Sequence, residues 1–210
     1  MPSATRTASP APPTETPAAP ARGCRPLGLL LLVAGAVGTL ASAVLTYDRI
    51  ESLANPAFSP GCNINAVLSC TDVMTTWQSN LFGFPNMLLG IAGFAVLGAL
   101  GLVLAVGAVF PRWLWLCVQA AVTGAFAFVV WLASQCLYVI GALCPWCMLV
   151  WAVTIPVFWC VTVRSLRTGA LPAPSWLVRA LAPRYAWLGL ALIYGVLTVL
   201  VLIRFGDQLL

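Results

Sequence analysis

The sequence predicts an all-α integral membrane protein with five transmembrane helices. Of its 210 residues, 61% are hydrophobic and only 7% are charged, whereas a soluble domain is about 25% charged. So few charges cannot cover a water-facing surface of this size, and lipid must therefore be the main solvent. The apolar residues are gathered in five runs, separated by segments that are polar or contain proline.

The first apolar run, Leu27–Tyr47, is expected to cross the membrane once. As a helix it is about 31 Å long, which matches a hydrocarbon core of about 30 Å. The motif Ala41-Ser42-Ala43 resembles a signal-peptide cleavage site, but the run is longer than the usual apolar region of such a peptide and follows a long polar tail. That tail, residues 1–26, is rich in Pro, Ala and Thr and is expected to be disordered.

The next three spans follow a long segment, residues 48–83. Phe84–Phe110 forms the second run, and the uncharged stretch Trp113–Val163 is long enough for two helices. We expect these two helices to turn at Tyr138–Leu143 and the later one to begin near Cys144-Pro145, because proline is favoured in a first helical turn.

Two further features complete the predicted organisation. Pro156 is expected to kink the fourth helix. A connector, residues 164–184, then leads to the last segment, residues 185–210, in which about Tyr185–Phe205 forms the fifth helix. The four-helix core is thus residues 27–163.

Arginine placement predicts the orientation. If the N-terminus is cytoplasmic, only Arg49 and Arg204 of the ten Arg lie outside, which is a clear positive-inside bias. The segment 48–83, the turn at Tyr138–Leu143 and the C-terminus then lie on the outer face, and both the tail and the connector are cytoplasmic.

The reactive side chains are few. The chain has no His, its ten basic residues are all Arg, and its five carboxylates lie outside the middle of the membrane. Acid–base catalysis by His, His-ligated metals or haem, and Schiff-base chemistry therefore lack their residues. Eight Cys remain, so sulfur chemistry is the leading prediction.

Four of the cysteines form two pairs on the predicted outer face. Cys144-Pro145-Trp146-Cys147 is a C-x-x-C motif at a helix start, where the helix dipole favours a thiolate. Cys62 and Cys70 alone are more typical of a structural disulfide, and their spacing is not usual for zinc. Together the two pairs favour a relay, because disulfide exchange needs only a thiolate that approaches a disulfide.

The remaining cysteines are interpreted as small apolar residues. They are Cys24, Cys117, Cys136 and Cys160. No metal site is expected.

The order of these motifs resembles the vitamin K epoxide reductase family, in particular bacterial homologues without a fused thioredoxin-like domain. The resemblance rests on the pair Cys62 and Cys70, the segment Ser79–Pro85, and Cys144-Pro145-Trp146-Cys147, and it covers about Leu27 to Val163. It implies a four-helix transmembrane bundle around a quinone of the menaquinone or ubiquinone type, plus a fifth transmembrane helix. The C-x-x-C motif would lie at the outer mouth of the bundle.

The resemblance also implies a role for each paired cysteine. Cys62 would take electrons from an external dithiol protein, and Cys70 would exchange disulfides with Cys144. Cys147 would pass the electrons to the quinone. The segment Asn65–Thr76 would form a short helix at the membrane surface.

Further residues are expected beside the quinone. Val73 and Met74 would face it from the short helix, and Ser79, Asn80 and Phe82 would lie beside it. Asn80 could hydrogen-bond a quinone carbonyl, with capping of the second helix as an equal alternative.

Trp151 is also expected in the quinone site, one helical turn after Cys147. Vertebrate members of the family tend to carry Tyr at the matching position, so neither their phenol hydrogen bond nor vitamin K epoxide as a substrate is expected here.

The expected function is that of a quinone-dependent thiol–disulfide oxidoreductase of the plasma membrane, which supports disulfide formation. It would reoxidise a secreted DsbA-like protein of thioredoxin fold, expected to be separate because the chain ends at Leu210. The alternatives are a DsbB-type quinone oxidase of different helix arrangement, a transmembrane carrier of reducing equivalents, and a scaffold with structural cysteines.

Overall fold

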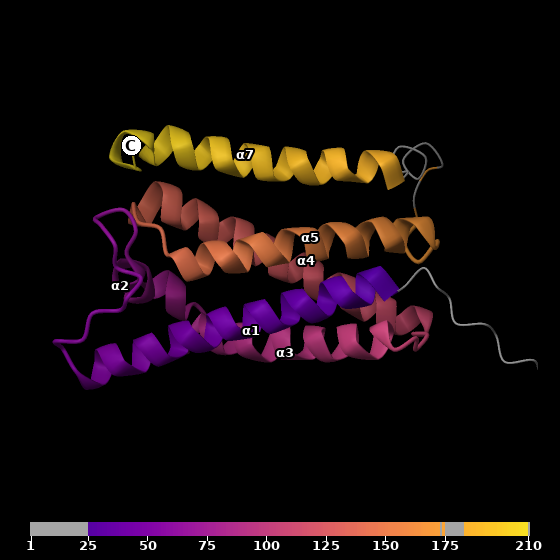
Figure 1. The fold of residues 1–210 in the computed structure, drawn as a ribbon, viewed down its shortest axis with the longest axis horizontal. Coiled ribbons are helices and arrows are strands. Elements are labelled where there is room, and N and C mark those ends of the chain that lie inside the picture. Colours follow the sequence, from indigo (N-terminus) through magenta and orange to yellow (C-terminus); the bar gives the residue numbers. More distant parts are fainter. Residues whose placement is uncertain (1–24, 173, 175–182, 210) are drawn as a thin grey trace, which may run out of the picture.

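The computed structural model describes residues 25–172, 174 and 183–209. In this part of the chain, five long helices run side by side (Figure 1), and each is long and apolar enough to cross a membrane. They are α1 (Arg25–Ala54), α3 (Asn86–Ala105), α4 (Arg112–Gln135), α5 (Pro145–Arg167) and α7 (Pro183–Leu209). The predicted all-α membrane fold is confirmed.

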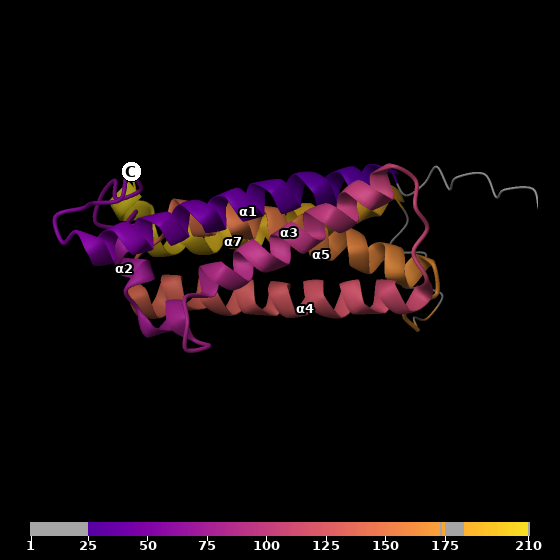
Figure 2. The ribbon, with the colours of Figure 1, turned by 90° about the horizontal axis from the view of Figure 1, so that it is seen from below.

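Glycines bring α1 and α3 into close contact, and Figure 2 shows α3 running obliquely across α1. A Cβ atom on Gly35 would lie 2.7 Å from the carbonyl oxygen of Phe94, and one on Gly101 would lie 2.8 Å from that of Gly28. These obstacles are backbone atoms, which cannot move aside as a flexible side chain can. Small residues at such crossings are the usual basis of helix packing in membranes.

The first two helices end differently from the predicted apolar runs. α1 continues to Ala54, beyond the predicted Tyr47. Pro56 follows two residues later and disfavours the helical conformation for Asn55, which precedes it. α3 ends at Ala105, before the predicted Phe110, in a Schellman motif around Gly107, whose φ is +104°. Hydropathy thus located the apolar runs, whereas local capping chemistry set the helix ends.

The turn between α4 and α5 lies close to its predicted place. α4 passes into a short π-helix, η2 (Cys136–Ile140), and Gly141 then adopts a left-handed conformation with φ +73°. Cys144 caps α5, and Pro145 occupies its first turn, as predicted. The turn itself is shorter than expected, because Tyr138, Val139 and Ile140 belong to the π-helix.

The short surface helix was predicted too long. Instead of Asn65–Thr76, α2 covers only Cys70–Met74 and is followed by a 3₁₀ turn, η1 (Trp77–Asn80). The preceding backbone is extended because Leu68 forms a parallel bridge with Leu143, and Ser69 then caps α2. A long-range backbone pairing has therefore replaced the expected first turns of the helix.

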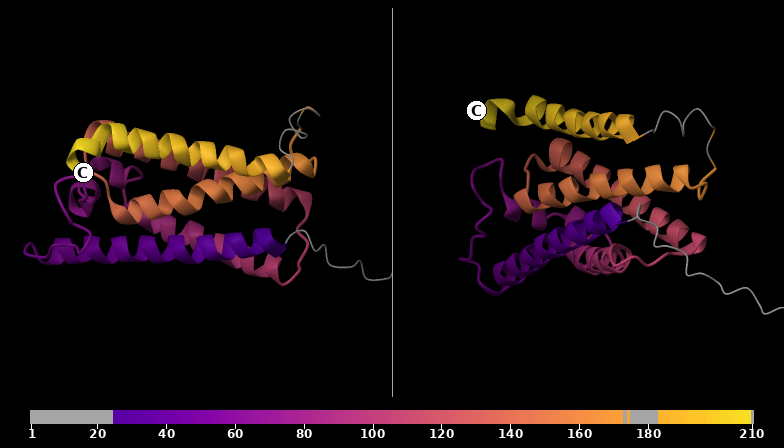
Figure 3. Two further views of the ribbon diagram at one scale, coloured as in Figure 1. Left: turned by 45° about the horizontal axis from the view of Figure 1, so that its top comes forward. Right: turned by 45° about the vertical axis from the view of Figure 1, so that its right-hand side comes forward.

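The fifth helix is confirmed and lies beside α5 (Figure 3). The hydroxyl of Tyr194 donates to the carbonyl of Ala152. Nε of Arg204 donates to the carbonyl oxygen of Leu137 at 3.0 Å, and Phe205 is buried in the same core cluster as Leu137. The C-terminal end of α7 therefore packs against the π-helix.

Two predicted segments fall partly outside the described residues. Of the predicted tail, residues 1–24 lie outside them, while Arg25 and Pro26 open α1. Of the predicted connector 164–184, residues 173 and 175–182 lie outside them, while its ends belong to α5 and α7.

Replacing Gly35 with Ala is expected to lower stability in detergent by about 1–3 kcal/mol, because the added methyl group meets backbone that cannot yield. Thermal unfolding would measure this loss. Gly195→Ala in α7 is the matched control, since a Cβ there has no neighbour within 4 Å. Equal melting temperatures for the two variants would contradict the close α1–α3 packing.

Candidate redox site

The loop cysteines are joined to each other. Cys62 and Cys70 form a disulfide, which is the pairing that the resemblance implied. Cys62 is 7% exposed and Cys70 is fully buried. Cys62 is therefore the more exposed of the two bonded residues.

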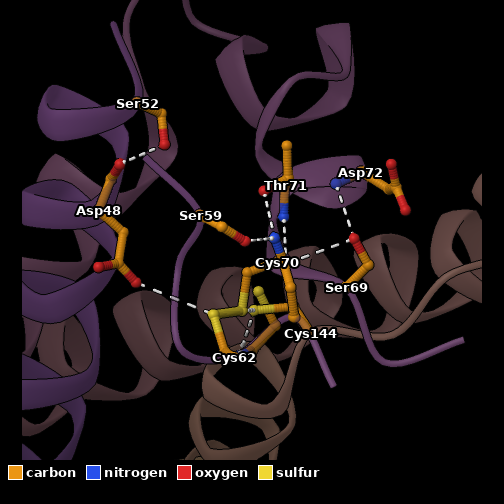
Figure 4. The surroundings of a disulfide bond; sticks show 11 residues. Asp48, Ser52, Ser59, Cys62, Ser69, Cys70, Thr71, Asp72 and Cys144 are labelled. Atoms are coloured by element: carbon orange, nitrogen blue, oxygen red, sulfur yellow. Dashed lines mark hydrogen bonds between the residues drawn. A yellow bond between two sulfur atoms is a disulfide. The ribbon is translucent and has the colours of Figure 1, made fainter. Parts of the chain in front are cut away.

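The second pair meets the loop disulfide at Cys144. Its Sγ lies 3.2 Å from Sγ of Cys70, in the arrangement drawn in Figure 4. A disulfide bond is about 2.0 Å long, so a movement of about 1 Å would join the two atoms. The structure thus brings together two of the predicted catalytic cysteines that are 74 residues apart in the sequence.

Backbone pairing holds these two sulfur atoms together. The N–H of Ser69 donates to the carbonyl of Leu143 at 3.0 Å, and the N–H of Leu143 donates to the carbonyl of Val67 at 2.7 Å. Cys70 directly follows Ser69 in the sequence, and Cys144 directly follows Leu143. The bridge therefore fixes the backbone of both cysteines beside each other.

The start of α5 favours the thiolate form of Cys144. The Cys147 thiol donates a hydrogen bond to the Cys144 sulfur, and the backbone N–H groups of Cys147 and Trp146 donate to the same sulfur. Together they hold the pKa of Cys144 below its ordinary value, although burial and the charge of Asp48 act to raise it. The pKa of Cys144 is thus lowered chiefly by the Cys147 thiol, whereas the sequence suggested only the helix dipole as the cause.

Side chains of the loop hold the disulfide segment in shape. The Asn63 amide donates to Oγ1 of Thr71 at 2.8 Å and accepts from the N–H of Thr71 at 3.2 Å. Oγ of Ser69 accepts from the N–H of Asp72 at 3.3 Å. These bonds tie the chain on both sides of Cys70.

A cavity of about 430 Å³ begins beneath these sulfur atoms and extends between the helices. Sulfur-bearing side chains form part of its wall, namely Cys136, Cys144 and Cys147. Five of the six residues that the sequence placed beside a quinone also line it: Val73, Met74, Ser79, Phe82 and Trp151. Trp151 is deeply buried, with 3% of its surface exposed.

Asn80 is the exception among the predicted quinone neighbours. It does not line the cavity, and its amide donates to the carbonyl of Thr76 at 3.3 Å and to Oγ of Ser79 at 3.0 Å. Its expected bond to a quinone stays a prediction. The structure places Asn80 in the turn before α3, whose N-cap is Pro85.

Sequence reasoning missed the amides that do face the cavity. Gln78 and Asn86 line it, and the buried oxygen of each side chain has no hydrogen-bond partner. The nitrogen of Gln78 donates to Oε1 of Gln135 at 3.3 Å, and that of Asn86 donates to the Gln78 carbonyl at 2.6 Å. Gln78 directly precedes Ser79, and its polarity in this apolar chain was the available signal.

Among the described residues, the other cysteines do not form a further pair. Cys117 is exposed and Cys160 half-buried, both as free thiols, whereas Cys24 lies outside the described residues. Cys136, interpreted from sequence as a small apolar residue, belongs to the cavity wall. Within the described residues, no group of His, Cys, Asp and Glu is arranged to hold a metal ion.

The sequence model that describes the vitamin K epoxide reductase family matches residues 29–162, which is more than half of the chain. No curated protein matches the chain.

The hydrogen bond from Cys147 makes a testable prediction about pH. In Cys147→Ala the donor is lost, so the pKa of Cys144 rises and its attack on the Cys62–Cys70 disulfide needs a higher pH. In Cys147→Ser a hydroxyl still donates, so the pH profile stays closer to that of the native pair. The measurement is the rate at which Cys62 is released and captured by a maleimide, followed from neutral to alkaline pH. Superimposable profiles for the two variants would contradict this account of Cys144.

Proposed function

The chain belongs to the vitamin K epoxide reductase family of membrane disulfide oxidoreductases, and we propose that it carries electrons from an external dithiol protein to a membrane quinone. The donor would be a DsbA-like protein of thioredoxin fold. Its reoxidation would support disulfide formation outside the cell. The observation that carries the proposal is the 3.2 Å contact between Cys70 and Cys144.

The first exchange takes place at the loop. A thiolate of the donor attacks Cys62, and Cys70 leaves with the electrons of the broken disulfide bond. The arginine distribution favours an outward-facing loop, with the plasma membrane as the location. Burial of Cys70 favours the attack at Cys62.

The second exchange passes the electrons inward. The Cys70 thiolate attacks Cys144 in a Cys144–Cys147 disulfide, and Cys147 leaves as the new thiolate. Cys62, once released from the donor, attacks Cys70 in the resulting Cys70–Cys144 disulfide as a thiolate, and Cys144 leaves as a thiolate, which the hydrogen bonds that lower its pKa favour. Cys147 belongs to the cavity wall, so the electrons arrive beside the proposed quinone site.

The cavity suits a quinone ring. Its volume of about 430 Å³ falls within the range of about 300–1,000 Å³ for small-molecule sites. A quinone supplies an acceptor for two electrons and two protons. In the proposal, the apolar wall with Trp151 and Phe82 holds the ring.

Gln78 and Asn86 would orient the ring through its oxygen atoms. With the amides oriented as in the structure, their unpartnered oxygens would accept a hydrogen bond from a hydroxyl of the reduced quinone. An amide turned about its last bond presents its NH₂ instead and donates to a carbonyl of the oxidised form. The same side chains can therefore bind both redox states.

The first test is an anaerobic assay of the purified full chain with reduced dithiol and a short-tailed quinone, followed by the loss of quinone absorbance. The wild type is expected to consume quinone, and Cys147→Ser is expected to reduce the rate to background, because the thiol beside the cavity is gone. Cys160→Ser is the matched control and should retain the wild-type rate. Equal rates for Cys147→Ser and the wild type would contradict the proposal, and a wild type without activity in native membranes would favour the carrier or scaffold.

The same assay tests the cavity. Gln78→Leu should raise the KM for quinone by about tenfold, the equivalent of about 1.4 kcal/mol for one lost hydrogen bond. Gln119→Leu is the control, since Gln119 also has an unpartnered buried oxygen but does not line the cavity. Equal effects of the two substitutions would place the quinone elsewhere.

A further inference from the structure

A buried carboxyl group lies beside the loop disulfide. Oδ2 of Asp48, on α1, is 3.8 Å from Sγ of Cys62, and Figure 4 shows the carboxyl group pointing from α1 toward that sulfur. Asp48 is only 7% exposed. Asp48 lies in the part of α1 that continues beyond the predicted apolar run.

Among the described residues, the contact with Cys62 is the one hydrogen-bond contact of the Asp48 carboxyl group. Ser52 bonds to the backbone carbonyl of Asp48 at 2.7 Å, not to its side chain. An uncompensated carboxyl group in a buried position costs stability, and such groups are often found where a protein uses them in chemistry.

The chemistry at Cys62 needs a proton donor and acceptor. In the disulfide the sulfur of Cys62 carries no hydrogen, but it becomes a thiolate whenever it is the leaving group of an exchange. Oδ2 of Asp48 already lies within hydrogen-bond distance of that sulfur. A carboxyl group at this distance can therefore give a proton to Cys62 or receive one at the same place.

We propose that Asp48 is the catalytic acid and base of the exchange between the external dithiol and Cys62. This inference rests on the proposed function, since it assumes that the dithiol enters at Cys62. It assigns a chemical role to a residue that neither the cysteine motifs nor the cavity includes.

The proton and electron steps balance as follows. The first thiol of the donor gives its proton to the Asp48 carboxylate as its sulfur bonds to Cys62, and Cys70 leaves with the electron pair of the broken bond. The second donor thiol then loses its proton to water and attacks the first donor sulfur. Cys62 leaves with the electron pair and takes the proton from Asp48. The donor ends as a disulfide, Cys62 as a thiol and Cys70 as a thiolate.

The test separates the two half-reactions of the full chain in detergent. The loop half-reaction is the anaerobic loss of the Cys62–Cys70 disulfide on mixing with reduced thioredoxin, followed by rapid thiol labelling. The quinone half-reaction is the single turnover of chemically pre-reduced protein with a short-tailed quinone. Asp48→Asn is expected to slow the loop half-reaction by about 100-fold, as is typical for loss of an acid–base group, and to spare the quinone half-reaction, in which Cys62 takes no part.

Two variants sharpen the comparison. Glu51→Gln removes a half-buried carboxyl group from the same helix and should leave both half-reactions at the wild-type rate. Asp48→Glu restores a carboxyl group and should recover part of the loop rate. A retained quinone turnover in Asp48→Asn also shows that the variant is folded.

Three results would overturn the assignment. If Asp48→Asn exchanges with thioredoxin as fast as Glu51→Gln does, the carboxyl group transfers no proton. If both half-reactions slow together, Asp48 supports the structure and not the exchange. If the wild type turns over quinone but does not exchange with thioredoxin, the external-dithiol step is wrong, and the role of Asp48 is lost with it.

Discussion

The backbone bridge between Leu68 and Leu143 is the constraint on which the redox site depends. Its two hydrogen bonds join the segment before α2 to the turn before α5, and each cysteine of the contact lies one or two residues beyond a bridged leucine. The bridge fixes the register of two segments that are distant in the sequence. Cys70 and Cys144 are therefore held close enough to exchange, without the entropic cost of bringing two free loops together.

The proposed relay separates the path of electrons from the supply of protons. In it, electrons would pass along sulfur atoms, from Cys62 through Cys70 and Cys144 to Cys147. Asp48 would transfer protons at the loop, and the amide of Gln78 would face the quinone from the cavity wall. Cys70 and Cys144 are buried, so in the proposed relay the exchange between them would be shielded from thiols of the solvent.

The sequence predicted those features that depend on local chemistry. Hydropathy located all five helices, and Cys144-Pro145 marked the start of α5 because capping and proline preference act within one turn. Features set by distant residues were predicted less well. The bridge to Leu143 shortened α2, and the side chain of Asn80 turned to its own segment. Gln78 could not be assigned to the cavity from the sequence, because no local pattern shows which residues will line a cavity.

The most direct test of the account is whether Cys70 and Cys144 form a disulfide. In the variant Cys62→Ala/Cys147→Ala each of them has lost its usual partner, and mild oxidation in the membrane should join them, which mass spectrometry of the linked peptides would detect. A triple variant that also carries Cys144→Ala is the control. The account predicts a Cys70–Cys144 link in nearly all molecules of the double variant. Oxidation that leaves Cys70 free, or joins it to Cys136 instead, would contradict the relay.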